Sequence, residues 1–235
     1  MALIIGVTGA IATGKSGVCW HLVEKYDGLH GDADKLVHRM FDPGTRGYYD
    51  VIKEFGREVL LPDGYVDRKK IGDMAFGNPE VMSRWMRAIG NIETQIRTQV
   101  DRWRAELGPN DIAILEAVNH IEAGYAAWCD ATWLVAAEPE TMKRRLMARN
   151  SFTDEEAEKR MSAQRKWQDR APGADHVFHN DGTVEELMAE VDRVMDDTLA
   201  KYRAGTLPAS VYHAWREANP RPAPQPRAEP AKASS

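Results

Sequence analysis

The start of the chain restricts its possible folds more than any other segment. Residues 3–7 are an uninterrupted apolar run, and a glycine-rich turn follows them at once. From Lys15 to about Tyr26, apolar residues recur at the spacing of one helical face. An apolar strand that enters a helix through a short glycine-rich turn is typical of a central parallel strand covered on both faces. The sequence therefore predicts an α/β protein with a parallel sheet.

The turn carries the pattern G-x-x-x-x-G-K-S from Gly9 to Ser16. In this pattern, backbone N–H groups of the loop surround phosphate oxygens, and the glycines permit the wrap. The Lys15 ammonium is expected on the β- and γ-phosphates of a nucleoside triphosphate, and the Ser16 hydroxyl on a bridging Mg²⁺. We therefore predict a P-loop, with nucleotide-binding residues Gly9, Ala10, Ile11, Ala12, Thr13, Gly14, Lys15, Ser16 and Gly17.

Apolar runs return at residues 112–115, 132–136 and, more weakly, 176–178, each followed by a helical pattern, and a weak strand is expected near Leu29. With the first strand they give a central parallel sheet of five strands flanked by helices. Asn78-Pro79 is a cap and first-turn pair that begins a long helical stretch. Its apolar stripe is predicted to be core and comprises Met82, Trp85, Met86, Ile89, Ile96, Val100 and Trp103.

Residues 1–203 are expected to form a single domain, because 235 residues with 43% apolar content can build a substantial core. Within it, a helical insertion is predicted at about residues 60–107 and a helical lid at about 148–170. Capping boxes at Thr153 and Thr183 predict two late helix starts. Residues 204–235 read as a Pro/Ala-rich tail, largely disordered from about residue 220.

The composition excludes several classes of protein. The formal charge of −5 argues against nucleic-acid binding, which usually needs a basic surplus. The N-terminal apolar run lacks a basic flank and is broken by glycines, so neither a signal peptide nor a membrane span is expected. Cys19 and Cys129 lack metal-site spacing and are predicted to be buried free thiols. We expect a cytoplasmic protein, a monomer or weak homo-oligomer.

An acidic pair, Asp32 and Asp34, follows the weak strand and precedes a helix expected from about Lys35. Either residue could simply cap that helix, since aspartate is a favoured N-cap. Alternatively, the second strand ends beside the P-loop, where a carboxylate could accept the proton of an attacking hydroxyl. The sequence leaves both interpretations open.

A basic cluster follows the strand at residues 132–136. Such a run is often a solvated helix face that pairs with the acidic residues 154–158. Phosphoryl transfer, however, needs cations near the γ-phosphate, and a mobile lid can supply them on closure. The cluster comprises Lys143, Arg144, Arg145, Arg149, Arg160 and Arg165.

Taken together, these features resemble dephospho-coenzyme A kinases over roughly residues 3–203. The resemblance implies a nucleoside-monophosphate-kinase-like P-loop fold with a helical acceptor-binding insertion and a lid. It also implies transfer of the γ-phosphoryl group of ATP, with Mg²⁺, to the ribose 3′-hydroxyl of dephospho-CoA. It is carried by residues 8–16, Asp32-Ala33-Asp34, Pro43-Gly44, Phe55-Gly56, Asp63-Gly64, Arg68, Asn78-Pro79, Arg149, Gln164, Ala174-Asp175, Asn180 and Gly182.

The resemblance also implies roles for particular residues. Asp34 would be the general base and Asp32 its partner. Arg149, and with it Arg145, would be lid arginines, while the segment from Asn180 to Gly182 would lie near the adenine of ATP. The small-molecule acceptor is expected to contact Thr8, Asp34, Asn91, Asn119, His120 and Glu122.

The chain departs from the family pattern mainly on the acceptor side. Gly90-Asn91 stands where the family has His-Pro, and residues 118–122 read Val-Asn-His-Ile-Glu where the family has Pro-Leu-Leu-aromatic-Glu. Polar residues there would change an apolar acceptor wall. In the P-loop, Ala12 replaces a usual glycine and Gly17 a hydroxyl residue that often touches the α-phosphate.

Two other functions therefore remain open. One is a diverged kinase that acts on another nucleotide-like hydroxyl acceptor. The other is an ATP-binding module without catalysis that contacts a protein partner through its insertion. A lone histidine such as His120 is usually a structural residue, and no second histidine at ligand spacing accompanies it, so no structural metal is expected.

Overall fold

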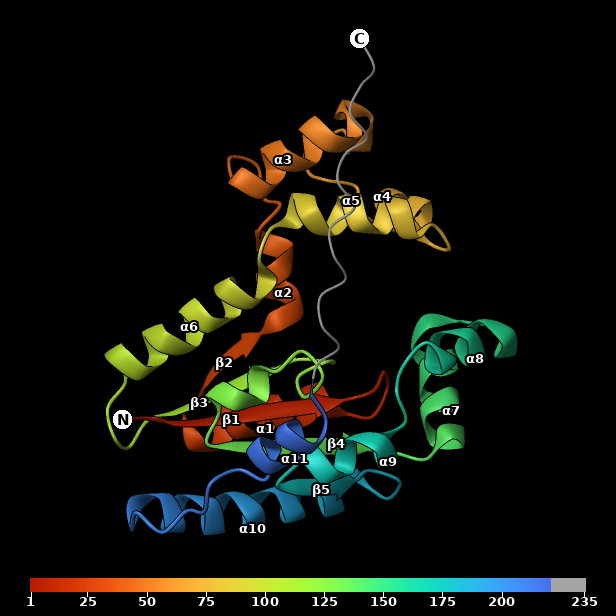
Figure 1. Cartoon of the computed structure of the whole chain (residues 1–235). Coiled ribbons are helices and arrows are strands. Elements are labelled where there is room, and N and C mark those ends of the chain that lie inside the picture. The colour runs from red at the N-terminus through yellow and green to blue at the C-terminus, as the bar shows by residue number, and fades with distance from the viewer. Residues whose placement is uncertain (221–235) are drawn as a thin grey trace.

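The computed structural model describes residues 1–220. At its centre lies one parallel sheet in the order β2-β3-β1-β4-β5 (Figure 1). The predicted sheet is thus confirmed, and β1 continues beyond its apolar run to the first glycine of the P-loop. The strands are β1 (Leu3–Gly9), β2 (Leu29–Asp32), β3 (Ile112–Glu116), β4 (Ala131–Ala136) and β5 (His176–His179).

Helices cover both faces of the sheet. On one face, α1 (Lys15–Tyr26) and α10 (Val184–Arg203) pack against the strands through a shared apolar core. On the other, α6 (Ile92–Glu106) and the start of α2 (Ala33–Arg39) cover β3 and β1. Every residue of β1, β3 and β4 is buried, which explains why these strands read as continuous apolar runs. The buried cysteines Cys19 and Cys129 are free thiols, as predicted.

The insertion forms a lobe above the sheet in Figure 1 with an apolar core of its own. The lobe contains α3 (Arg46–Phe55), the 3-10 turn η1 (Arg57–Val59), α4 (Arg68–Ala75) and α5 (Pro79–Ile89). It therefore begins before the predicted start at about residue 60, and α6, which lies within the predicted range of about 60–107, packs on the sheet instead. Asn78 caps α5, as predicted, by accepting from the N–H groups of Glu80 and Val81.

The predicted single stripe of core residues is wrong for two methionines. Met82 and Met86 are 45% and 47% exposed, whereas Ile96, Val100 and Trp103 are buried. The face of α5 that packs in the lobe carries Val81, Trp85 and Ala88, so Met82 and Met86 lie off that face. In addition, the helix breaks at Gly90, whose φ is +84°. Because α5 and α6 are separate helices, the two halves of the stripe do not share one face.

The lid region follows β4 and consists of α7 (Pro139–Asn150), α8 (Asp154–Ser162), α9 (Trp167–Arg170) and the 3-10 turn η3 (Ala171–Gly173). Both predicted capping boxes are present: Thr153 begins α8, and Thr183 begins α10. Among residues 1–220, none of the helices has the length and apolar character that crossing a membrane would require.

The chain does not leave the body of the protein at residue 204. A last helix, α11 (Tyr212–Ala218), returns and buries Tyr212 against Ile121 and Ala126, next to the 3-10 turn η2 (Tyr125–Trp128). The segment that the composition assigned to a tail therefore includes a packed helix. The disorder predicted from about residue 220 concerns residues outside the described part.

Candidate active site

The P-loop joins β1 directly to α1, and its shape depends on glycines at two positions. A side chain at Gly9 would bring its Cβ to 2.5 Å from the Val135 carbonyl oxygen. Gly14 has a φ of +93°, and a Cβ there would lie 2.2 Å from Asn180 Nδ2. Gly14 also caps α1 without any side-chain hydrogen bond, which leaves the first N–H groups of the helix available to an anion.

Ala12 occupies a backbone conformation that suits glycine. Its φ is +61°, in the left-handed region that L-residues other than glycine adopt at a cost. The replacement of a family glycine by Ala12 is therefore a strained feature of this loop. Gly17, in contrast, has no such requirement, because a Cβ there would meet only Met188 Cε at 3.8 Å.

Glu116, which the sequence reading did not single out, is the central acidic residue of the site. It ends β3 beside β1, in register with Val7, and its side chain is buried. Its Oε1 forms an ion pair with the Lys15 ammonium and accepts a hydrogen bond from Ser16 Oγ at 2.7 Å. From this place beside the P-loop serine, an acidic residue commonly helps to hold Mg²⁺.

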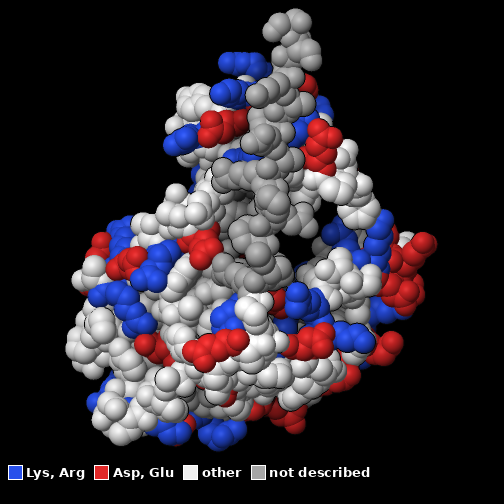
Figure 2. All heavy atoms as spheres, viewed as in Figure 1, with Lys and Arg blue, Asp and Glu red and all other residues white. Residues whose placement is uncertain are grey.

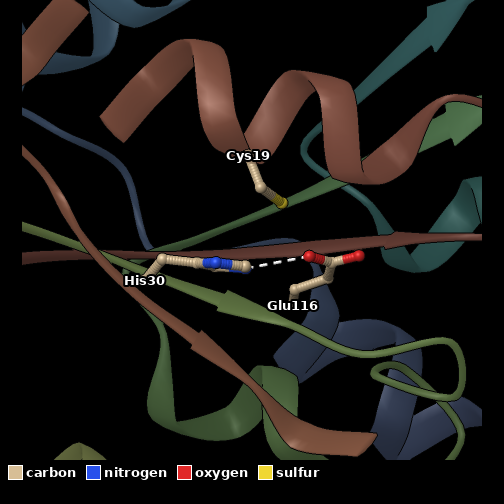
Figure 3. A group of neighbouring side chains, drawn as sticks. All are labelled: Cys19, His30 and Glu116. Atoms are coloured by element: carbon tan, nitrogen blue, oxygen red, sulfur yellow. Dashed lines mark hydrogen bonds and ion pairs between the residues drawn. The ribbon is translucent and has the colours of Figure 1, made fainter. Parts of the chain in front are cut away.

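His30 completes the surroundings of Glu116 from β2, with its Nε2 2.8 Å from Oε2 (Figure 3). Burial acts to raise the pKa of Glu116, but the hydrogen bond from His30 and the Lys15 ammonium outweigh burial and hold that pKa well below its usual range. The carboxylate is therefore ionised at neutral pH and keeps Lys15 in place. An acidic residue at the end of an apolar run was the available sequence signal.

Cys19 points from α1 toward the same carboxylate, as Figure 3 shows. One ligand atom each of Cys19, His30 and Glu116 lies within 4.8 Å of the others, a spacing that a metal ion could use. Glu116 already accepts hydrogen bonds from Ser16 and His30 and pairs with Lys15. Because a cation here would face the Lys15 ammonium, we assign the cluster to the P-loop rather than to a separate metal centre.

The acidic pair divides its roles. Asp32 caps α2, since its Oδ1 accepts from the N–H groups of Asp34 and Lys35 at 2.9 and 3.2 Å. The Asp34 carboxylate makes no hydrogen bond or ion pair within residues 1–220. Desolvation, followed by repulsion from Asp32, raises the pKa of Asp34, and Lys15 partly opposes the shift. Asp34 is thus the unengaged carboxylate beside the P-loop lysine.

Asn180, which directly follows β5, and Arg145 of α7 support the P-loop. Asn180 is buried and donates from Nδ2 to the Thr13 carbonyl oxygen at 2.8 Å. Arg145 donates to the Asn180 carbonyl oxygen at 2.8 Å and to Asn180 Oδ1 at 3.2 Å. Arg145 is therefore engaged beside the loop, whereas Arg149, in the last turn of α7, is exposed. Within residues 1–220 the Arg149 side chain bonds only its neighbour Asn150. Gly182 lies just before the capping box of α10.

The lid touches both the P-loop and the insertion. Gln164, after α8, accepts a hydrogen bond from the Ile11 N–H at 2.7 Å. The Lys159 ammonium lies 4.5 Å from the ring centroid of Phe76, which belongs to the insertion. Figure 2 shows the surface hollowed between these two parts, with basic side chains along the lid edge. Within the predicted basic cluster, Lys143 pairs instead with Asp154 and Glu158.

Three residues that were expected to contact the acceptor contact other parts of the protein or are buried in this structure. Thr8 is fully buried and donates its hydroxyl to the Val118 carbonyl oxygen at 2.9 Å. His120 is also fully buried, and a Cβ on Gly6 would lie 1.9 Å from its Nε2. Burial lowers the pKa of His120 to about 3, so its ring stays neutral. Thr8 and His120 are therefore closed to solvent in this structure, and their contact with an acceptor stays a prediction. Glu122 is only partly buried, and its Oε1 lies 2.7 Å from Nε of the buried Arg170.

Two other expected acceptor residues are exposed but differ in place. Asn119 follows β3 and is open to solvent. Asn91 caps α6 by accepting from the Thr94 N–H at 3.1 Å and lines a cavity of about 700 Å³ between α2, α3, α5 and α6. None of the P-loop residues lines that cavity. The structure therefore brings Asn119, but not Asn91, next to the strand that carries Glu116.

Comparison with known proteins places this site in a family. A family model described as dephospho-CoA kinase matches residues 3–186. A dephospho-CoA kinase of Geobacter sulfurreducens is 36% identical over 193 residues, which cover 81% of this chain and 96% of the relative. One of Symbiobacterium thermophilum is 36% identical over 191 residues, with 80% and 78% covered.

Solved structures agree on the fold. The crystal structure of TT1252 from Thermus thermophilus superimposes with a TM-score of 0.68 at 26% identity, covering 83% of this chain and 97% of that one. A dephospho-CoA kinase from Campylobacter jejuni gives a TM-score of 0.62 at 21% identity, covering 84% and 97%. The match to the family model spans the P-loop, the acidic residues of β2 and β3, and the lid. The chain belongs to the dephospho-CoA kinase family.

Proposed function

We propose that this protein transfers the γ-phosphoryl group of ATP to the ribose 3′-hydroxyl of dephospho-CoA, which gives coenzyme A and ADP. The chain belongs to the dephospho-CoA kinase family, and the observation that supports the proposal is how four side chains are arranged at the carboxyl end of the sheet. Lys15, Ser16 and Glu116 meet at the P-loop, and the Asp34 carboxylate, which has no bonded partner in the described part of the chain, interacts electrostatically with Lys15 and Glu116. A P-loop with an unengaged carboxylate beside it suits phosphorylation of a hydroxyl group.

Each residue has a separate task in the proposed reaction. Lys15 stabilises the charge of the β- and γ-phosphates, and backbone N–H groups of the loop and of the start of α1 bind their oxygens. Ser16 and Glu116 offer oxygen ligands beside the phosphate site, a donor set that fits Mg²⁺. Bound Mg²⁺ supplies neutralisation of the phosphate charge. Because Lys15 pairs with Glu116 here, its ammonium exchanges this partner for phosphate oxygens when ATP enters.

Asp34 accepts the proton of the attacking hydroxyl. A raised pKa makes a carboxylate a better base, and the absence of a bonded partner within residues 1–220 leaves it free to meet the acceptor. Arg149 lies at the start of the lid and would reach the transferring group as the lid closes. Asn180 supports the P-loop through its hydrogen bond to the Thr13 carbonyl oxygen. We propose this role for it in addition to the expected position near the adenine of ATP.

The structure weakens the case for a different acceptor. That case rested on two altered places, Gly90-Asn91 in the helical insertion and Asn119-His120 in the segment after β3. His120 and Ile121 are fully buried, so of the altered residues 118–121 only Asn119 is exposed. In the segment after β3 the acceptor wall is therefore changed at one exposed position. Gly90 and Asn91 are also exposed, but they line a cavity that no P-loop residue lines, so we propose dephospho-CoA itself as the acceptor.

Incubation of the purified chain with ATP, Mg²⁺ and dephospho-CoA tests the proposal, with ADP and CoA both quantified by chromatography. We expect equal amounts of the two products, and their loss in Asp34→Asn but not in the exposed control Asp42→Asn. ADP without CoA would indicate hydrolysis instead. Turnover with another nucleotide-like alcohol, but none with dephospho-CoA, would support the diverged kinase.

The remaining expectations are less specific. We propose a cytoplasmic location, in keeping with two buried free thiols. We also expect a small-molecule acceptor rather than a nucleic acid, and a monomer or weak homo-oligomer in solution. Gel filtration coupled to light scattering would measure the oligomeric state.

A further inference from the structure

The last helix packs on the segment that borders the acceptor side of the site. Helix α11 lies outside residues 3–186, which the family model matches, and it contacts the turns η2 and η3. In Figure 1 it lies beside α9, at the end of the lid region. Its position suggests a task connected with the loop after β3 rather than with the nucleotide.

The return of the chain to this place is held by Asp175. Ser210 Oγ donates to Asp175 Oδ2 at 2.7 Å, and the Val211 N–H donates to Asp175 Oδ1 at 2.9 Å. The same carboxylate accepts from the Thr132 N–H of β4 at 2.6 Å. The start of α11 is thus connected to the central sheet through the Asp175 carboxylate.

Arg216 carries the contact between α11 and the loop. Its Nη2 donates to the carbonyl oxygens of Ile121 and Glu122 at 2.6 and 3.1 Å. Its Nε donates to the Tyr212 hydroxyl at 2.8 Å, and its guanidinium lies 5.3 and 5.1 Å from the ring centroids of Tyr212 and Trp215. A guanidinium held against two neighbouring rings presents its donors in one direction, so it restrains the backbone that it binds.

Trp215 fills the space between the loop and the end of the lid region. A Cβ on Gly173 would lie 3.1 Å from Trp215 Cδ2 and 3.2 Å from Ile121 Cγ2, so the three groups are closely packed. Glu122, whose carbonyl Arg216 binds, has its carboxylate 2.7 Å from Arg170 Nε at the end of α9. One helix therefore restrains both the loop after β3 and the residues that follow the lid.

The loop is held at its two ends, and of the two residues between them Asn119 is exposed and His120 is buried. Thr8 binds the Val118 carbonyl oxygen at the first end, and Arg216 binds Ile121 and Glu122 at the second. Asn119 lies exposed between these points, shortly after Glu116. The positions of both attachment points thus determine where Asn119 faces the acceptor.

We propose that α11 is a positioning element for acceptor binding, and that Arg216 is its positioning residue. This inference rests on the proposed function, because it takes the loop after β3 as one wall of the acceptor site. Arg216 does not touch the acceptor. It holds the backbone of residues 121–122 in the place that acceptor binding requires.

The test compares Arg216→Ala, Arg216→Lys and the control Arg203→Ala, an exposed arginine on α10. For Arg216→Ala we expect the KM for dephospho-CoA to rise between about tenfold and a hundredfold, with the KM for ATP unchanged. Arg216→Lys keeps the charge but loses the fork, so it should fall between the wild type and Arg216→Ala. The control should behave as the wild type. Equal changes in both KM values, or a loss of thermal stability alone, would reduce α11 to a structural role and overturn the inference.

Amide hydrogen exchange provides a readout that does not depend on turnover. Residues 119–124 should exchange faster in Arg216→Ala than in the wild type or in the Arg203→Ala control, while the P-loop amides keep their protection. Unchanged exchange in residues 119–124 would overturn the inference whatever the acceptor. A wild type that forms no CoA would instead refute the proposed function and leave the exchange result to decide on α11.

Discussion

The strained conformation of Ala12 leads to a quantitative prediction about Ala12→Gly. The φ of this residue is +61°. A left-handed conformation costs an L-residue roughly 1–2 kcal/mol that glycine does not incur. Glycine in turn loses more conformational entropy on folding, about 0.4–1 kcal/mol relative to alanine. The difference predicts that Ala12→Gly raises the free energy of unfolding by about 0.5–1 kcal/mol.

Thermal unfolding of the full chain, without nucleotide, measures this change. For a protein of this size, about 1 kcal/mol corresponds to roughly 2–4 °C in Tm, so Ala12→Gly should raise Tm by about 1–4 °C. Because the loop keeps the same shape, the KM for ATP should not rise. Nucleotide must be absent, since ATP binding would itself stabilise the folded state.

Two control substitutions separate strain from other effects of glycine. Ser151→Gly, at a residue with φ of +54° after α7, should also raise Tm. Ala189→Gly, at an exposed site inside α10, should lower stability by about 1 kcal/mol, because glycine is unfavourable in a regular helix. If Ala12→Gly lowers Tm as Ala189→Gly does, Ala12 is not strained and the reasoning is wrong.

Three further predictions concern the chemistry of the site. Gly17→Ser should fit without strain, because the Cβ would meet only Met188 Cε at 3.8 Å. The added hydroxyl is a hydrogen-bond donor at the start of α1, so the KM for ATP should fall, and a higher KM would contradict this. Glu116→Gln should raise the Mg²⁺ concentration that gives half-maximal activity by about 10–100-fold, as a Mg²⁺ titration would show; an unchanged titration would exclude Glu116 from the metal site. Because the pKa of Asp34 is raised, the ionised carboxylate destabilises the folded state at neutral pH, and protonation removes this cost. Asp34→Asn should therefore raise Tm at about pH 7, and the difference in Tm from the wild type should disappear as the pH falls toward about 4. It should also abolish turnover. A gain in Tm that does not depend on pH would show that the pKa of Asp34 is not raised.

The features that could be predicted from the sequence are those formed by residues close together in the chain. The P-loop was readable because its glycines, lysine and serine act within one turn between a strand and a helix. The capping boxes at Thr153 and Thr183 were readable for the same reason, since their partners lie three residues away. Continuous apolar runs indicated buried parallel strands.

The contacts between residues far apart in the sequence could be seen only in the folded structure. Glu116 reaches Lys15 because β3 lies between β2 and β1, and no local pattern states the order of strands. Residues 118–122 looked like an acceptor wall in sequence, yet the turn after β3 buries His120 under Gly6. Arg216 binds a backbone 95 residues earlier in the chain. Local preferences are set by groups a few residues apart, whereas burial and long-range contacts depend on how whole helices and strands pack. For this reason the role of Glu116 and the contact made by α11 could not be predicted from the sequence.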